Sequence, residues 1–303
     1  MLIKPVLAKS NDRTVKAKNH ATSGEPELWF SNETLSGSGL FGFSFNFFID
    51  WSSYEVSKEV WITRIATSGT DLEDLSIESI LAKIVECDGE EHLRRSAKFF
   101  SNKGLTYKYI IFQDSNDWGG NPSPIVEATI DEDGNVSQVQ RISLIDLMGS
   151  IKRLSGGPVS VGRKGLNYST SSLEGYLSKT DSLYPGDLDQ LLLNEDGEAV
   201  AVLEYKKHTL DNAIQRQTLS NYYPTPDARK YDRIAMLRDH IDPELPIIIV
   251  YYPTKSHISS LKLELIDGSR GSLKSVKTNI VPLPTKDSIQ TYQTVLNAIL
   301  TMI

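Results

Sequence analysis

Cysteine is nearly missing from this sequence, since Cys87 is the only one in 303 residues. A disulfide framework requires cysteine pairs, and a cysteine-based zinc site requires several cysteines. Both are therefore excluded. Because structural disulfides are typical of oxidising compartments, their exclusion favours an intracellular, cytoplasmic location as the default expectation.

Long hydrophobic runs are also missing, and a bilayer-spanning helix needs roughly 20 consecutive apolar residues, so no membrane span is predicted. The opening residues "MLIKPVLAKSNDRTVKAKNH" carry lysines without the apolar core of a secretory signal. No P-loop, GxSxG, HExxH or Cys/His metal pattern occurs. With 39% hydrophobic and 23% charged residues, the composition indicates a globular chain of one large or two ordinary domains.

The net charge of −7 argues against a surface that is basic overall, but the charge is unevenly distributed. Residues 206–280 contain 12 Lys and Arg against 8 Asp and Glu, a surplus of four positive charges, so the remainder carries −11. A positive segment of this kind is compatible with a phosphate-bearing partner such as nucleic acid. An ordinary solvated surface explains the same counts.

Residues 1–155 are predicted to form a β-rich α+β domain, with a recognition or regulatory role as its expected function. The first 25 residues are polar and basic and are expected to form a loose arm. Phenylalanines at alternate positions from 41 to 47 indicate a strand with one buried face. Further strands are expected in "EVWITRIAT", "LTYKYIIFQD" and the hairpin "IVEATIDEDGNVSQVQRISL". Helices are expected in "SIESILAKIVECDG", ended by Gly89, and in "SLIDLMGSIKRLSGG", capped by Ser143.

The paired glycines Gly156-Gly157 mark the predicted boundary to a second domain, residues 156–303. Helices are expected in "STSSLEGYLSKT", "LDNAIQRQTLSNYY", "DARKYDRIAMLRDHI" and "KDSIQTYQTVLNAILTMI". The run "LPIIIVYYPT" indicates a strand that is covered on both faces, and "LKLELID" and "VKTNIVPL" indicate two more strands. This half is therefore predicted to be α/β, with a mixed sheet flanked by helices.

The segment "YPGDLDQLLLNEDGEAVAVLEYKKHT" is predicted to be a β hairpin that carries unusual charges. A type I′ turn at Asp196-Gly197 pairs residues whose numbers add to 393, so that Asp189 faces Glu204. A turn one residue earlier would instead place Asp187 opposite Glu204. The first register also forms two apolar pairs, Leu191 with Val202 and Leu193 with Val200.

Either register places an aspartate across from Glu204, with Lys206 on the same face of the hairpin. Directly opposed Cβ atoms lie about 4.5–5.5 Å apart, where two carboxylates repel. Lys206 supplies one neutralising charge, and a divalent cation that prefers oxygen ligands, such as Mg²⁺, supplies two. Apolar side chains continue both faces of the hairpin, which suggests that the charges lie at the rim of a buried sheet. The alternative is a solvent-facing hairpin whose ion pairs contribute little to stability.

The order Asp189, hairpin turn, Glu204-Tyr205-Lys206 resembles the signature of the PD-(D/E)xK nuclease superfamily. "PGDLDQ" is similar to the GxxD approach of its RecB-like branch, because Asp189 follows Gly186 by three residues. The order helix, strand, strand, helix, strand also matches the core of that superfamily. The resemblance covers about residues 165–255 and implies a restriction-endonuclease-like fold, whereas no family is recognised in residues 1–155.

The resemblance implies Mg²⁺-dependent hydrolysis of phosphodiester bonds, with Mn²⁺ able to substitute. Asp189, Glu204 and the backbone carbonyl of Tyr205 would hold the metal, which lowers the pKa of a bound water and stabilises charge on the phosphate. Lys206 would orient that water or help to deprotonate it. Glu174, on the preceding helix, would hold a second metal ion or its water.

Other polar residues near the hairpin have weaker signals. Lys207 is expected on the opposite face, without a chemical role. His208 is more simply explained as a cap or surface residue, and the polar loop Asp114–Pro122 as a structural loop. Candidate nucleic-acid contacts, each with an ordinary surface role as the alternative, are Gln215, Arg216, Gln217, Arg229, Lys230 and Arg233.

The sequence therefore predicts a metal-dependent endodeoxyribonuclease of the restriction, phage-defence or repair type, with nucleic acid as its partner, no membrane contact, and a homodimer compatible with this role. An RNA-directed or structure-specific nuclease fits the same residues. A non-catalytic nucleic-acid-binding or assembly module that keeps the nuclease fold is the third hypothesis. The intact set of Asp189, Glu204 and Lys206 argues against that third hypothesis.

Overall fold

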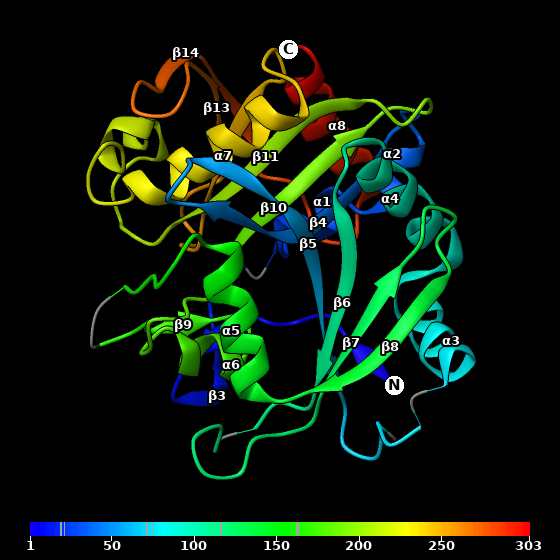
Figure 1. The fold of residues 1–303 in the computed structure, drawn as a ribbon. Coiled ribbons are helices and arrows are strands. Elements are labelled where there is room, and N and C mark those ends of the chain that lie inside the picture. The colour runs from blue at the N-terminus through cyan, green and yellow to red at the C-terminus, as the bar shows by residue number, and fades with distance from the viewer. Residues whose placement is uncertain (19, 21, 71, 75, 116, 162–163) are drawn as a thin grey trace. The chain divides into compact units, whose positions relative to one another are not determined.

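The computed structural model describes the whole chain except residues 19, 21, 71, 75, 116 and 162–163, and the chain divides into two compact units (Figure 1). The first unit comprises Met1–Ala17 and Phe45–Asp187, and the second comprises Lys18–Ser44 and Leu188–Ile303. Each unit contains strands of mixed direction flanked by helices, so the chain is α/β, as predicted for residues 156–303, whereas residues 1–155 were expected to be α+β. These bounds differ from the boundary predicted at residues 155/156, and the functional division at that point stays a prediction.

The sheet of the first unit is built around one parallel pair, β5 with β6, between antiparallel neighbours. Its order is β4-β5-β6-β7-β8, with β1 paired to β5. The predicted strands and the predicted hairpin at residues 125–142 are confirmed. The bounds are β1 (Leu2–Ile3), β4 (Phe41–Asp50), β5 (Glu55–Ala66), β6 (Thr106–Phe112), β7 (Ile125–Ile130) and β8 (Val136–Ile142).

Helices cover both faces of this first sheet because its central strands alternate apolar side chains on the two sides. Tyr107 packs against Phe100 of α4 (Glu90–Asn102), which follows α3 (Ile77–Asp88). Ile110 and Phe112 instead join the apolar cluster formed with α5 (Leu144–Leu154) and α6 (Ser172–Leu177). Gly89 at φ +85° ends α3, and a capping box at Ser143 begins α5, so both predicted signals are confirmed.

The amino-terminal segment is not the predicted loose arm. Its described residues form β1 and a small sheet in which β2 (Ala8–Lys9) lies between β3 (Asp12–Lys16) and β9 (Tyr168–Ser169). The Arg13 guanidinium donates to the carbonyls of Ala8 and Ser169 at 3.2 and 2.7 Å. Composition indicated a solvated tail, but one arginine joins it to a distant loop.

The second unit carries the predicted hairpin in a sheet of order β10-β11-β12-β13-β14. The β11–β12 pair is parallel, and the other pairs are antiparallel. Every residue of β12 is buried, which confirms the strand predicted to be covered on both faces. The bounds are β10 (Gly186–Leu193), β11 (Ala199–His208), β12 (Ile247–Pro253), β13 (Ser260–Asp267) and β14 (Lys274–Pro282).

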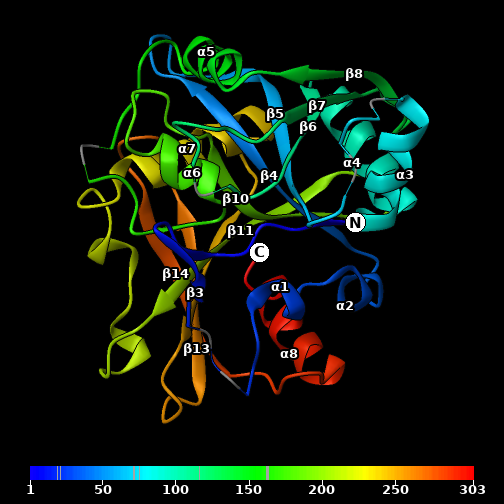
Figure 2. The same ribbon diagram turned by 90° about the horizontal axis from the view of Figure 1, so that it is seen from below.

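Different helices cover the two faces of this second sheet (Figure 1, Figure 2). On one face, α1 (Pro26–Trp29) and α8 (Ile289–Leu300) contribute to a core that includes Leu203 and Val250. The short α2 (Asn32–Ser36) adds Leu35 to the same core. On the other face, α7 (Ala228–Ile241) brings its first residues to β11. The helices predicted in these last two segments, 227–241 and 286–303, are confirmed for α7 and α8.

The hairpin turn has the predicted register but a different geometry. Leu191 lies opposite Val202, as the sum of 393 requires, whereas Leu193 pairs with Ala199 instead of Val200. Gly197 alone within the turn has positive φ, at +80°, so the predicted type I′ turn is wrong. Such a residue after a type I turn introduces a bulge, which absorbs the one-residue shift near the turn.

The helix predicted over residues 210–223 is wrong, because this segment forms only the short 3₁₀ turns η1 (Ile214–Arg216) and η2 (Leu219–Asn221). Glu264, fully buried on β13, accepts hydrogen bonds from the Leu219 nitrogen and the Thr218 hydroxyl, both at 2.8 Å. A buried carboxylate needs such donors. The hydrogen bonds that the buried Glu264 requires therefore override the helical pattern of this segment.

Candidate functional site

The Glu204-Tyr205-Lys206 segment lies on β11, where alternation directs its side chains to both faces of the sheet. Tyr205 stacks on Phe30 at 5.9 Å between ring centroids, on the side of α1 and α8. Glu204 and Lys206 both contact residues at the start of α7. The shared face that the sequence predicts for Glu204 and Lys206 is therefore seen in their contacts.

Asp189 lies against the backbone of this segment. Its Oδ2 accepts a hydrogen bond from the Tyr205 nitrogen at 2.6 Å. In an antiparallel pair the N–H and C=O of one residue point to the same side, so the Tyr205 carbonyl also faces β10. The structure thus brings Asp189 to the backbone of the residue that the resemblance names as the carbonyl ligand. The paired residues of β10 and β11 begin with Gln190 opposite Leu203 and continue toward the turn. The binding of one metal ion by both Asp189 and Glu204 stays a prediction.

Glu204 is the most deeply buried charge of the candidate site, with a side chain that is 0% exposed. It forms an ion pair with the Lys230 ammonium, which reaches it from the first turn of α7. Tyr231, the next residue, is buried, and burial together with the Glu204 charge raises the pKa of its phenol well above the usual range. The Tyr231 hydroxyl has no hydrogen-bond partner among the residues that the structure describes.

Lys206 contacts a different carboxylate, that of Asp227. Its Nζ lies 2.7 Å from Asp227 Oδ2 at the beginning of α7 and 4.0 Å from the centroid of the Tyr222 ring. Cations over aromatic faces are attracted by the ring quadrupole. Burial and the Asp227 charge raise the pKa of the Tyr222 phenol. Sequence reasoning missed Asp227 and Tyr222, because Tyr222 lies in the irregular loop that follows the hairpin and Asp227 lies at its end.

A buried polar network holds this loop in place. The Tyr222 hydroxyl donates to Gln217 Oε1 at 2.5 Å, and the Lys262 ammonium donates to the Gln217 carbonyl. Tyr251 donates its hydroxyl to Glu264 at 2.7 Å. Gln217, predicted as a candidate nucleic-acid contact, is only 4% exposed and therefore has a structural contact in place of a surface role.

Lys207 points to the opposite face of β11 from Lys206, as predicted. Burial lowers the pKa of its ammonium, and the charges of Glu25, Glu27 and Asp189 oppose that effect. Two of these neighbours, Glu25 and Glu27, lie at the beginning of α1, and the absence of a chemical role for Lys207 stays a prediction.

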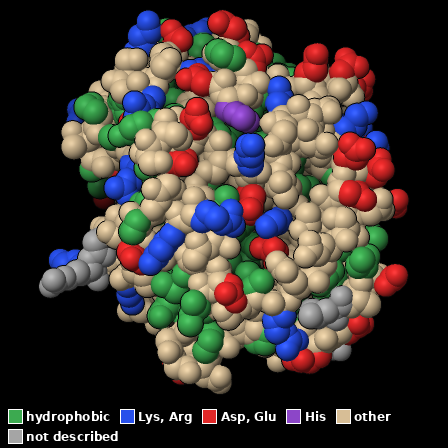
Figure 3. Space-filling view, viewed as in Figure 1, with side chains coloured by type: hydrophobic (Ala, Val, Ile, Leu, Met, Phe, Trp, Pro, Cys, Tyr) green, Lys and Arg blue, Asp and Glu red, His purple; other side chains and the backbone are tan. Residues whose placement is uncertain are grey.

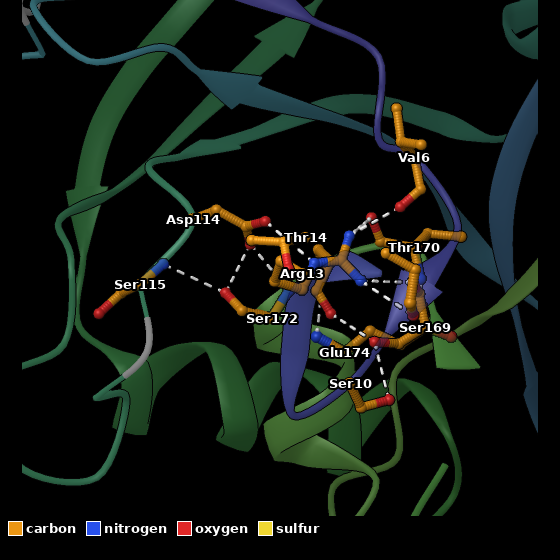
Figure 4. A network of polar contacts seen from close by, with 12 residues as sticks. Val6, Ser10, Arg13, Thr14, Asp114, Ser115, Ser169, Thr170, Ser172 and Glu174 are labelled. Carbon is orange, nitrogen blue, oxygen red and sulfur yellow. Dashed lines mark hydrogen bonds and ion pairs between the residues drawn. The ribbon is translucent and has the colours of Figure 1, made fainter. Parts of the chain in front are cut away.

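Glu174 belongs to the first unit, on α6, within the polar network of Figure 4. Its carboxylate accepts hydrogen bonds from the Thr170 nitrogen at 2.6 Å and the Thr170 hydroxyl at 2.7 Å. Burial raises the pKa of Glu174, and the nearby charge of Asp187 adds to the effect. These contacts give Glu174 a structural function, and its predicted part in metal binding stays a prediction.

His208 and the loop Asp114–Pro122 have structural contacts. The ring Nε2 of His208 lies 2.7 Å from the Asn212 carbonyl in a buried position. In the loop Asp114–Pro122, of which residue 116 lies outside the described residues, the Trp118 indole donates to Ser172 at 2.8 Å. Asp114 accepts from the Ser172 hydroxyl at 2.5 Å. The loop contacts agree with the structural role expected for the loop, whereas the buried position of His208 contradicts a surface role.

The possible ligands near β11 are of the chemical type that Mg²⁺ prefers, because Asp189, Glu204 and the Tyr205 carbonyl all present oxygen atoms. Among the described residues no group of three or more His, Cys, Asp and Glu side chains is placed to hold a metal. Mg²⁺ commonly uses one or two carboxylates and keeps several waters, so a larger group is not required. The Tyr231 hydroxyl, which has no hydrogen-bond partner among the described residues, is a buried donor that such waters would satisfy.

Comparisons with known proteins assign no family to this two-unit α/β chain. No family model and no curated protein matches the sequence. Solved structures give weak likenesses, and one is the sex pheromone staph-cAM373 precursor, at 9% identity and a TM-score of 0.22, covering 86% of this chain and 83% of that one. Another is the sex pheromone precursor from Lactobacillus salivarius subsp. salivarius UCC118, at 7% identity and a TM-score of 0.16, covering 79% and 67%. Likeness this low supports no conclusion on fold or function.

Within the described residues, no helix combines the length and the apolar character that crossing a bilayer requires.

Proposed function

We propose that this protein is a Mg²⁺-dependent nuclease that hydrolyses phosphodiester bonds, with DNA as its substrate and a fold related to the PD-(D/E)xK superfamily. The observation that supports it most is the 2.6 Å hydrogen bond from the Tyr205 nitrogen to Asp189. This bond places the aspartate beside the backbone between Glu204 and Lys206. Those residues are the ones that the motif requires.

Asp189, Glu204 and the Tyr205 carbonyl would hold the metal, with Mn²⁺ able to replace Mg²⁺. When bound, the metal would activate water as the nucleophile and stabilise charge on the phosphate. Lys206 would place its ammonium beside the reacting phosphate, and Asp227 at 2.7 Å and the Tyr222 ring would orient it. Glu174 is proposed as an additional acidic residue.

The surface charge is compatible with a nucleic-acid partner without identifying it. Figure 3 shows basic side chains interspersed with acidic ones on the face in view, not one uniform basic patch. Arg229 is exposed on the first turn of α7, one residue before Lys230. Its guanidinium would contact a phosphate of the nucleic-acid backbone. Restriction, phage defence and repair all fit such a nuclease, and so does a homodimer.

A non-catalytic nucleic-acid-binding or assembly module is the second candidate, and the ion pairs favour it. Lys206 pairs with Asp227 and Lys230 pairs with Glu204, so two of the three charges of the motif have counter-charges from α7. Such pairs occur in proteins that bind no metal, where they only balance buried charge. A module of this kind would bind nucleic acid equally well with and without Mg²⁺.

The test is incubation of the protein with plasmid, linear and single-stranded DNA and with RNA, in Mg²⁺, Mn²⁺ or EDTA. Cleavage should require the divalent cation and should be lost in Asp189→Ala and Lys206→Ala. The matched controls are Asp267→Ala and Lys274→Ala, an exposed ion pair of the same sheet, which should cleave normally. Cleavage that survives both site substitutions would remove the assignment, and binding without cleavage of any substrate would support the second candidate.

A further inference from the structure

The ion pair between Glu204 and Lys230 joins two side chains of very different exposure. The Glu204 side chain is 0% exposed, whereas the Lys230 side chain is 30% exposed. A carboxylate that has lost its water needs a positive charge beside it, and Lys230 provides one. The lysine ammonium is carried on a flexible four-carbon stem, so it can reach solvent by rotation of its own side chain.

Lys206 lies on the same face of β11 as Glu204, but its ammonium pairs with a different carboxylate. Its Nζ lies 2.7 Å from Asp227 and 4.0 Å from the Tyr222 ring centroid. Asp227 and Lys230 are three residues apart at the beginning of α7, which places both side chains on one side of the helix. The helix therefore presents a carboxylate to Lys206 and an ammonium to Glu204.

The Tyr231 hydroxyl is a second, independent observation that indicates a ligand site beside Glu204. Its side chain is 2% exposed, and its hydroxyl lacks a hydrogen-bond partner within the described part of the chain. Glu204 and Lys230 are its electrostatic neighbours. A buried hydroxyl without a partner is unfavourable, and bound water or another ligand commonly satisfies it. A cation that keeps several waters would bring such a partner to Tyr231.

We propose that Lys230 is a tethered counter-ion at the cation position of Glu204, and that a divalent cation displaces its ammonium toward solvent. This inference rests on the proposed metal site and adds a residue that sets its affinity. Lys230 and the cation compete for one carboxylate, so the lysine weakens divalent-cation binding while it stabilises the metal-free protein. Removing the lysine charge should therefore strengthen cation binding.

The first test uses the unaltered full-length protein. Acetic anhydride labels accessible lysine amines, and mass spectrometry measures the labelling rate at each lysine with and without Mn²⁺. The Lys230 rate should rise several-fold with Mn²⁺, because the ammonium leaves the buried carboxylate. Lys255, an exposed lysine paired with Asp211, is the internal control and should not respond. An unchanged Lys230 rate at saturating Mn²⁺ would overturn the inference.

The second test compares Mn²⁺ affinity by titration calorimetry. Lys230→Met should bind Mn²⁺ about tenfold more tightly than the wild type, because one repulsive charge beside the cation is gone. Lys255→Met should bind as the wild type does. Equal Mn²⁺ affinities of Lys230→Met and wild type would overturn the inference. If Lys230→Met does not fold, the labelling experiment on the unaltered protein provides the test.

The two proposals fail in different ways. Mn²⁺ binding with the Lys230 response, but without cleavage of any nucleic acid, would overturn the nuclease and support the counter-ion. Metal-dependent cleavage with an unresponsive Lys230 would overturn the counter-ion alone. No detectable Mn²⁺ binding by wild type and Lys230→Met would overturn both.

Discussion

The Asp189 carboxylate accepts a hydrogen bond from the backbone nitrogen of Tyr205 at 2.6 Å. This contact gives the aspartate a structural role that can be separated from metal binding. In Asp189→Asn the amide oxygen can still accept the bond, while the charge is lost. We expect the free energy of unfolding to change by only about 1 kcal/mol and Mn²⁺ affinity to fall at least tenfold. Calorimetry and chemical denaturation measure the two quantities.

Asp189→Ala is the informative comparison, because it removes both the charge and the acceptor. It should lose Mn²⁺ binding and also lose more stability than Asp189→Asn, since the Tyr205 nitrogen is left without this partner. Normal Mn²⁺ affinity in Asp189→Asn would show that the aspartate only supports the backbone.

Most of the fold could be predicted from the sequence because periodicity and caps act locally. The strand at residues 247–253 and the helix begun by Ser143 follow from an apolar run and a capping box. The segment 210–223 could not be predicted correctly, because its conformation depends on Glu264, which lies far along the chain. The role of Arg13 is hidden for the same reason, since its acceptors are carbonyls at Ser169 and Thr170.

The candidate site was only partly predictable. Strand alternation placed Glu204 and Lys206 on one face, and turn arithmetic gave the register of Leu191 with Val202. The counter-charges Asp227 and Lys230 lie beyond an irregular loop, so no spacing rule links them to β11. The residues that neutralise a buried charge are brought together by the tertiary structure. A sequence motif contains only residues that are close in sequence, so it does not identify them.

The Lys206–Asp227 pair offers a test of whether Lys206 acts in chemistry or only in packing. Lys206→Met should lower the free energy of unfolding by about 1 kcal/mol or less, as expected for a partly exposed pair. Cleavage should fall by about 10² to 10⁴-fold, the scale of a lost proton-transfer or charge-stabilising group. Steady-state rates and denaturation curves give both numbers.

Asp227→Asn and the double variant complete a thermodynamic cycle for that pair. Asp227→Asn should keep most of the cleavage activity, because its amide oxygen can still accept the hydrogen bond from Lys206 and only the counter-charge is lost. A Lys206→Met protein with full cleavage and reduced stability would identify the lysine as purely structural.

Glu174→Gln tests the acidic residue of the first unit. Because the folded pKa of Glu174 is raised, the folded state binds its proton more tightly than the unfolded state does. Its ionisation therefore costs stability as the pH rises above the unfolded value. Glu174→Gln should be at least as stable as the wild type at pH 7, to within about 1 kcal/mol. A fall in cleavage in this stable variant supports a role in chemistry, whereas unchanged cleavage restricts Glu174 to its Thr170 contacts.

We expect His92 to make the stability of the first unit dependent on pH. Burial lowers the pKa of its imidazole to about 4, assisted by Arg64 and Lys4 and opposed by Asp88. The unfolded chain therefore binds the proton more tightly, and stability is complete above about pH 6.5 and decreases as the pH falls toward 4. The loss should reach about 1–3 kcal/mol by pH 4. Denaturation of wild type and His92→Gln across this range measures it, and parallel pH profiles for the two proteins would contradict the prediction.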